Sequence, residues 1–208
     1  MIAALYVEPN GVYFAIPGVD LWDELRDART YCGPWPVVAH PPCQRWGRFW
    51  HGSTRRPHLF QLGDDGGCFE AALAATKKFG GVLEHPADSH AWAHFGIPAP
   101  KRFSGWSEAG AGWTCYVEQG HYGHFSRKPT WLFVSGVKRE DLPELDWSKG
   151  AQRLHPIALE RYGYAKARRI GMTAMIGGKH KTSIRNATPI PFRDVLIGIA
   201  RSAIWQMT

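Results

Sequence analysis

The chain has 208 residues, of which 44% are hydrophobic and 21% are charged. This is enough apolar material for one well-buried domain, and it excludes a disordered tail and a disulfide-stapled miniprotein. Lysine and arginine outnumber aspartate and glutamate by 25 to 18, which gives a formal net charge of +7. The excess of cations favours a polyanionic partner such as nucleic acid.

The sequence contains no apolar run long enough for a membrane-spanning helix, and Glu8 comes too early for a signal peptide. We therefore expect a soluble, cytoplasmic protein that has no membrane partner. The four cysteines form no C-x-x-C pair, which is typical of free thiols in a reducing compartment.

The first 40 residues predict three strands and one helix. We expect strands over residues 1–7 and 12–16, because turn residues separate two runs of aliphatic and aromatic side chains. Asp20 is a suitable N-cap for a helix from about Leu21 to Thr30. The apolar run 36–40 then predicts a buried strand that ends in a loop.

The middle of the chain predicts a loop, a helix and a strand in succession. Residues 44–57 are basic and aromatic without a regular period, so we expect a long functional loop. Apolar residues at helical spacing follow Gly66-Gly67, and Gly80-Gly81 ends this helix before a strand over 82–84.

Two more strands are expected over 113–117 and 130–134, and a terminal helix over 191–206. These patterns predict a single α/β domain over residues 1–208, with a compact Rossmann-like sheet, an antiparallel portion and helices on both faces. Residues 138–185 are less regular and rich in cations. We interpret them as a small basic insert, which either faces nucleic acid or is a solvated surface.

Two reactive side chains are expected at the carboxyl ends of the strands, where open α/β sheets bind their ligands. Cys43 follows the strand over 36–40, and the charges of Arg45 and Arg48 would lower the pKa of its thiol. Glu84 ends the next strand, where its carboxyl group can hold a proton if burial raises its pKa.

The ten histidines are also candidate metal ligands. Candidate sets are His40 with Cys43 and His51, His90 with His94, and His121 with His124. No set gives four ligands at a recognised spacing, so we expect no metal site.

The segment Pro41-Pro42-Cys43-Gln44 resembles the nucleophile motif of the cytosine-5 DNA methyltransferases. Glu84-His85-Pro86 resembles their Glu-Asn-Val or Glu-Asn-Pro motif, with His85 in place of asparagine. The resemblance implies that the Cys43 thiolate adds to carbon 6 of a flipped-out pyrimidine. It also implies that Glu84 bonds ring nitrogen 3 and the exocyclic amine.

Two later segments are similar to the same family, in the same order. Residues 122–136 resemble its Tyr-Gly element and Gln-x-Arg-x-Arg strand: Ser126 stands near the glutamine, Arg127 or Lys128 near the first arginine and Thr130 near the second. Residues 185–191 resemble the closing Gly-Asn-x-Val-Pro element, with Arg185 in place of glycine. The resemblance implies a methyltransferase-type fold, a catalytic role for Arg127 or Lys128, and a methyl-donor site bordered by Asn186 and Thr188.

The chain departs from the family before Pro41, where the Gly-rich loop that cradles S-adenosylmethionine is absent and Asp20 is the nearest substitute for its acidic residues. We therefore expect S-adenosylmethionine to bind weakly if at all, so that a different donor or a pre-modified base is used.

The resemblance implies an enzyme that modifies DNA pyrimidines at carbon 5, as in viral and bacterial DNA-modification systems. The alternatives are substituent exchange on a pre-modified base such as 5-hydroxymethyluracil, the same methylation on RNA, and an inactive nucleic-acid-binding relative. The residues expected to contact nucleic acid are Gln44, Arg45, Trp46, Arg48, Trp50, Arg55 and Tyr122.

Overall fold

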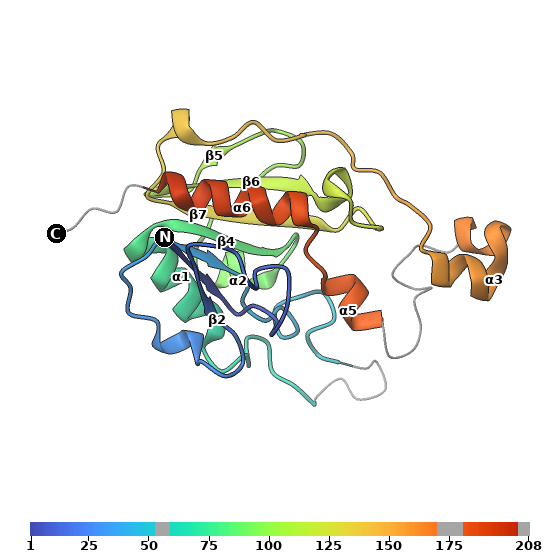
Figure 1. The fold of residues 1–208 in the computed structure, drawn as a ribbon, viewed down its shortest axis with the longest axis horizontal. Coiled ribbons are helices and arrows are strands. Elements are labelled where there is room, and N and C mark those ends of the chain that lie inside the picture. The colour runs from blue at the N-terminus through green and yellow to red at the C-terminus, as the bar shows by residue number, and fades with distance from the viewer. Residues whose placement is uncertain (53–58, 170–180, 204–208) are drawn as a thin grey trace.

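The computed structural model describes residues 1–52, 59–169 and 181–203 (Figure 1). Seven strands form one sheet in the order β2-β1-β3-β4-β7-β6-β5. Their bounds are β1 Ile2–Leu5, β2 Val19–Trp22, β3 Val37–Ala39, β4 Gly81–Pro86, β5 Ser107–Glu108, β6 Gly112–Glu118 and β7 Pro129–Ser135. The strands β2, β1, β3 and β4 are parallel, whereas β7, β6 and β5 are added in antiparallel pairs. The prediction of an α/β sheet with an antiparallel portion is therefore confirmed.

Helices cover both faces of this sheet because side chains along each strand alternate between two apolar cores. On one face, Ala3 and Leu5 of β1 lie in a core with α1 (Cys68–Phe79) and α2 (His90–His94). On the other face, Ile2 and Ala4 lie in a core with α6 (Ile190–Ser202). The expected helix after Gly66-Gly67 is α1, and the expected terminal helix is α6, which ends before the undescribed residues 204–208.

The region between β1 and β3 differs from the prediction. Residues 12–15 form turns, and Ala15 has a left-handed φ of 58°. Residues 19–22, expected at the start of a helix, form β2, which pairs in parallel with β1 from Ile2 opposite Val19 onward. Hydrogen bonding to an open sheet edge outweighs the helical pattern here. Asp27, rather than Asp20, caps a short 3-10 helix, η1 (Ala28–Thr30).

The strand β2 pairs with one side of β1, and the next strand in the chain, β3, pairs with its other side. The direction of strand order therefore reverses between β1 and β3. Open α/β sheets bind ligands beyond the carboxyl ends of the strands at such a switch point.

The expected basic insert contains η3 (Arg139–Asp141), α3 (Pro156–Arg169) and α5 (Lys181–Asn186). Figure 1 shows α3 projecting away from the sheet, and its described apolar side chains form a small cluster of their own around Ala158 and Ala167. None of the described helices is long and apolar enough to cross a membrane.

Gly81 allows β4 to lie close to β3. Its φ is 116°, and a Cβ there would overlap the carbonyl oxygen of Val37. We expect Gly81→Ala to destabilise the protein by about 3 kcal/mol or more, since both the overlap and the backbone conformation are unfavourable. Urea unfolding measures this change.

Gly96→Ala is the matched control, because Gly96 also has a positive φ, of 64°, but open space around it. Its expected cost is about 1 kcal/mol. Equal costs at the two positions would contradict the packing argument.

Candidate active site

The carboxyl end of β4 holds a buried carboxylate surrounded by hydrogen-bond donors. Glu84 is 8% exposed. Its Oε2 atom lies 3.1 Å from Nδ1 of His40, and its Oε1 atom accepts a 3.0 Å hydrogen bond from Nε2 of Gln119. The same Gln119 nitrogen lies 2.9 Å from the hydroxyl oxygen of Thr130. Three elements, the end of β3, the end of β6 and the start of β7, thus converge on Glu84.

These partners reverse the expected ionisation of Glu84. Burial raises its pKa, but the hydrogen bond from His40 and the charge of Lys128 outweigh burial and hold the pKa at about 2. The expectation of a protonated carboxyl group is therefore wrong, because it considered burial without the donors. Glu84 is an ionised hydrogen-bond acceptor at neutral pH.

Tyr13 lies behind His40 at the switch point of the sheet. Its hydroxyl oxygen is 2.8 Å from Nε2 of His40, and its side chain is 3% exposed. The segment that carries Tyr13 is fastened to α6, because Arg193 donates a 2.7 Å hydrogen bond to the carbonyl oxygen of Val12. Tyr13 is therefore held beside His40 by contacts with both the sheet and α6.

Cys43 lies near this cluster and is partly buried. Burial raises the pKa of its thiol, as does the charge of Glu84, whereas Arg185 and Lys128 lower it. The cations that act on the thiol are thus not the two expected from the sequence. Arg45 instead lies over the ring of Phe60, at 3.4 Å from its centroid, and the exposed Arg48 lies near Phe49.

The hairpin between β6 and β7 holds α5 beside the cluster. Lys128 donates hydrogen bonds from Nζ to the carbonyl oxygens of Asn186 and Ala187, at 2.9 and 2.8 Å. Nε2 of His124 lies 3.2 Å from the carbonyl oxygen of Ile184. Burial lowers the pKa of Lys128, and the charges of Glu84, Cys43 and Glu8 raise it. The contacts of Lys128 and His124 place Arg185, near the end of α5, within electrostatic reach of Cys43.

Other expected residues lie outside these contacts. Arg127 is partly buried, and its Nε atom has no hydrogen-bond partner among the described residues. Of Arg127 and Lys128, it is Lys128 whose charge lowers the pKa of Glu84. Asp20 lies on the edge strand β2 and is paired with Arg26 at 2.7 Å. Its described contacts include neither Asn186, the last residue of α5, nor Thr188, which follows that helix.

His85, the residue in place of the family asparagine, points to the opposite face of β4 from Glu84. It lies against Phe69 and Trp92, with ring centroids 5.1 and 6.1 Å away. Burial lowers its pKa to about 4. His85 is therefore a core residue in the neutral state.

The expected nucleic-acid contacts differ in their accessibility. Trp46 is 3% exposed, packs against Phe69 and Phe95, and donates a 2.8 Å hydrogen bond to Asp65. Its predicted availability for base stacking is therefore wrong, because the ring anchors the loop to the amino end of α1. Tyr122 is half-buried against Phe192.

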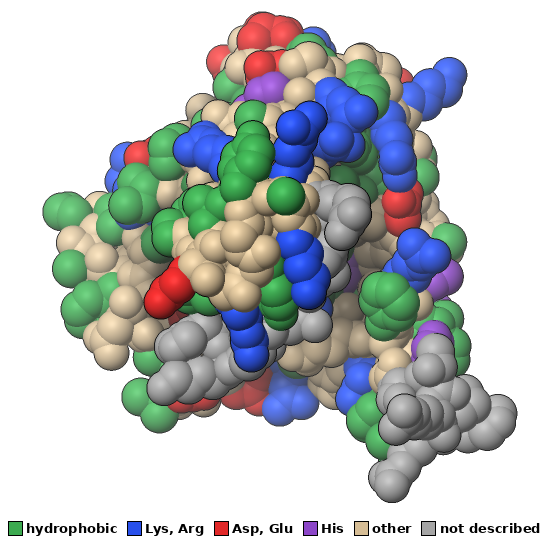
Figure 2. All heavy atoms as spheres, turned by 90° about the vertical axis from the view of Figure 1, so that its right-hand side faces the viewer, with side chains coloured by type: hydrophobic (Ala, Val, Ile, Leu, Met, Phe, Trp, Pro, Cys, Tyr) green, Lys and Arg blue, Asp and Glu red, His purple; other side chains and the backbone are tan. Residues whose placement is uncertain are grey.

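The other expected contacts lie nearer the surface. Gln44 and Arg48 are exposed, and Arg45 and Trp50 are partly buried. Arg55 lies outside the described residues. Figure 2, which views the right-hand side of Figure 1, shows Lys and Arg side chains distributed over much of that face.

The sequence pattern does not single out Tyr13 or Gln119. It marks Thr130 only through the family resemblance, and it offers His40 only as a metal ligand. Gln119 follows directly after the buried strand β6, and a polar side chain in that position is a usable signal. Among the described residues, no group of three His, Cys, Asp or Glu side chains could hold a metal ion.

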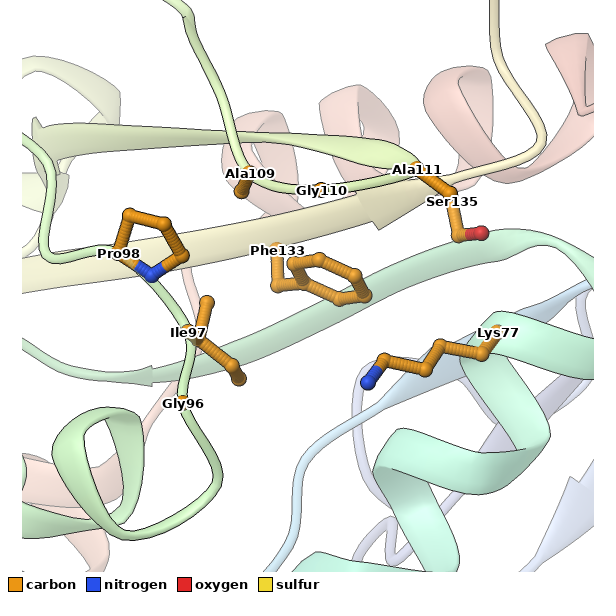
Figure 3. A pocket seen from close by; sticks show the side chains of 9 residues that line it. All are labelled: Lys77, Gly96, Ile97, Pro98, Ala109, Gly110, Ala111, Phe133 and Ser135. Carbon is orange, nitrogen blue, oxygen red and sulfur yellow. The ribbon is translucent and has the colours of Figure 1, made fainter.

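A pocket of about 360 Å³ lies near the end of β7, where Ser135 pairs with Gly81 at the amino end of β4 (Figure 3). Its wall is formed mainly by apolar side chains, including Ile97 and Phe133, with Lys77 as its cation. None of its lining residues belongs to the Glu84 cluster, so the pocket is a separate feature.

No protein-family model matches the chain, and a search of curated proteins also gives no match.

We expect Glu84→Gln to lower the free energy of unfolding at pH 7 by about 1–3 kcal/mol, because it replaces a carboxylate that accepts charge-assisted hydrogen bonds. The pKa of Glu84 is lower in the folded than in the unfolded protein. Its stabilising contribution is therefore complete above about pH 5 and is lost as the pH falls from there towards 2. Urea unfolding of both proteins across this range should show the difference between them shrinking.

Glu108→Gln is the control, because Glu108 is exposed on the edge strand β5. Its expected effect is within about 0.5 kcal/mol at every pH. A difference between the parent and Glu84→Gln that stays constant down to pH 3 would argue against an ionised Glu84.

Proposed function

We propose that the protein is a DNA base-modification enzyme that acts at carbon 5 of a pyrimidine through a covalent Cys43 adduct at carbon 6. The observation that carries this proposal is the convergence of a partly buried thiol, an ionised carboxylate and two cations at one edge of the sheet. The order of Cys43, Glu84 and Lys128 along the chain supports it, since it matches the order of the motifs in the cytosine-5 methyltransferases.

The proposed chemistry gives each of these groups a role. When the Cys43 sulfur bonds to carbon 6, the C5=C6 double bond is lost and carbon 5 becomes the nucleophile that attacks an electrophile. Carbon 5 then loses its proton and the sulfur leaves carbon 6, which restores the double bond and frees the thiol. Glu84 accepts a hydrogen bond from an N–H group on the pyrimidine edge. Lys128 and Arg185 stabilise negative charge on a pyrimidine oxygen or a phosphate.

Substrate binding would also favour the thiolate. The charge of Glu84 raises the pKa of Cys43 in the free protein. Hydrogen bonds from a base would spread that charge, while the effects of Arg185 and Lys128 on the thiol remain. The nucleophile would thus form mainly after the base is in place.

The resembled family binds S-adenosylmethionine, but the residues at the switch point of this chain do not favour its binding. Tyr13 fills the space beside His40, and Asp20 is occupied by Arg26. Asp65 already accepts the N–H groups of Gly67 and Phe69 at the amino end of α1. This favours the second candidate, substituent exchange on a pre-modified base such as 5-hydroxymethyluracil, for which no methyl donor is needed. In that exchange the Cys43 adduct expels the hydroxyl group as water, an incoming nucleophile adds to the exocyclic methylene carbon, and the thiolate then leaves carbon 6.

DNA is the proposed partner. The net charge of +7 and the cations on the face in Figure 2 support binding to a phosphate backbone. Gln44, Arg48 and Trp50 lie near Cys43 in the sequence and are at least partly exposed. A flipped-out base is required, because carbon 6 is not accessible in a stacked duplex.

We expect the parent protein to form a covalent complex with DNA that carries 5-fluoro-2′-deoxycytidine or 5-fluoro-2′-deoxyuridine, because the fluorine blocks completion after addition at carbon 6. Cys43→Ser should form no complex while retaining DNA affinity. Intact-mass spectrometry with and without S-adenosylmethionine detects the added oligonucleotide.

Cys68→Ser is the matched control, since Cys68 is also partly buried and has a raised pKa, and it should still form the complex. A complex in Cys43→Ser would refute the proposed nucleophile. A complex with matched RNA alone would assign the activity to RNA. DNA binding without a complex would indicate an inactive relative.

We expect no micromolar binding of S-adenosylmethionine or its demethylated product to the free protein, because the Gly-rich loop is absent and Asp20, the nearest substitute for the family's acidic residues, is already paired with Arg26. Calorimetric titration with and without DNA measures this. Micromolar binding that Asn186→Ala abolishes would contradict the expectation and restore an ordinary methyltransferase.

A further inference from the structure

His40 connects two buried groups that belong to different parts of the chain. Its Nδ1 atom lies 3.1 Å from Glu84, and its Nε2 atom lies 2.8 Å from the Tyr13 hydroxyl oxygen. The His40 and Glu84 side chains are only 13% and 10% exposed. Both ring nitrogens are therefore engaged, and the ring has little freedom to rotate.

The ionised state of Glu84 determines where the His40 proton lies. A carboxylate accepts hydrogen bonds only, so Nδ1 of His40 must carry a proton. In the neutral imidazole, Nε2 then accepts a hydrogen bond from the Tyr13 hydroxyl group. Burial raises the pKa of Tyr13 well above its usual value, which keeps that hydroxyl protonated. The arrangement runs from hydroxyl to imidazole to carboxylate, in the way that other enzymes orient an imidazole.

We propose that His40 is a positioning residue, which Tyr13 holds in place so that its Nδ1–H group fixes the Glu84 carboxylate toward the substrate. This role rests on the proposed function, in which Glu84 accepts a hydrogen bond from the pyrimidine. The sequence resemblance does not supply it, because His40 precedes the Pro-Pro-Cys segment that carries the resemblance.

Other charged or titratable groups also act on Glu84 or lie against it. They are Lys128 from the hairpin before β7, His85 from β4, Tyr13 from the segment after β1, and Cys43 from the loop after β3. Gln119 adds a neutral donor. Among the influences that lower the pKa of Glu84, the hydrogen bond from His40 is the largest. Removing that bond should therefore raise the pKa of Glu84 while Lys128 and Gln119 retain part of the stabilisation.

A matched pair of variants separates the two contacts of His40. In His40→Asn, the amide nitrogen replaces Nδ1, so the bond to Glu84 is retained. In His40→Gln, the longer side chain places its amide near the position of Nε2, so the contact with Tyr13 is retained and the bond to Glu84 is lost. NMR titration of ¹³C-carboxyl-labelled glutamates, with Glu84→Gln to assign the signal, measures the ionisation of Glu84 directly.

We expect His40→Gln to raise the titration midpoint of Glu84 by about one pH unit, a tenfold change in its ionisation constant, and His40→Asn to stay near the parent. The acid limb of the pH dependence of covalent-complex formation should move in the same way. Equal midpoints in the two variants, or no shift in His40→Gln, would overturn the proposal.

Tyr13→Phe provides a second test, because it removes one hydroxyl group and keeps the ring. If neither His40 variant folds, Tyr13→Phe decides. A raised titration midpoint of Glu84 supports the positioning role of His40, and an unchanged midpoint overturns it. The NMR readout needs no substrate. If the Glu84 midpoint shifts as expected but the protein forms no covalent complex, the effect of His40 on Glu84 is supported. The proposed function is then refuted independently.

Discussion

The buried carboxylate of Glu84 constrains most of this structure. An ionised carboxylate inside a protein is strongly unfavourable unless donors surround it. Here the donors are His40 after β3 and Gln119 after β6. The charge of Lys128, just before β7, adds to their effect. The parallel and antiparallel halves of the sheet must therefore meet at the correct register for Glu84 to remain ionised. The interactions that stabilise the fold are also those that assemble the site.

Two segments outside the sheet lie beside the same strand ends, namely the turns around Tyr13 and the helix α5. The segment with Tyr13 covers the switch point and is fastened to α6 by Arg193. The end of α5 covers the thiol side and is fastened by Lys128.

Several sequence expectations were wrong for one shared physical reason. Local patterns report propensity, whereas long-range pairing decides between competing states. Val19–Trp22 joins β1 because a parallel edge was available, and Trp46 is buried because Asp65 and Phe69 provide a partner and a packing surface. Similarly, burial alone predicts a protonated Glu84, and only the neighbouring donors reverse the result.

The sequence by itself determined the α/β class, the strand that carries Glu84 and the strand that precedes Cys43. It also determined the helix α1 with its glycine boundaries and the terminal helix. These features depend on local periodicity and on Gly and Pro positions, which act within a few residues. Only the tertiary structure decided that Tyr13, His40, Gln119 and Thr130 join Glu84, and that Arg185 and Lys128, rather than Arg45 and Arg48, act on Cys43. These contacts join residues far apart in the chain, and sheet order and register bring them together.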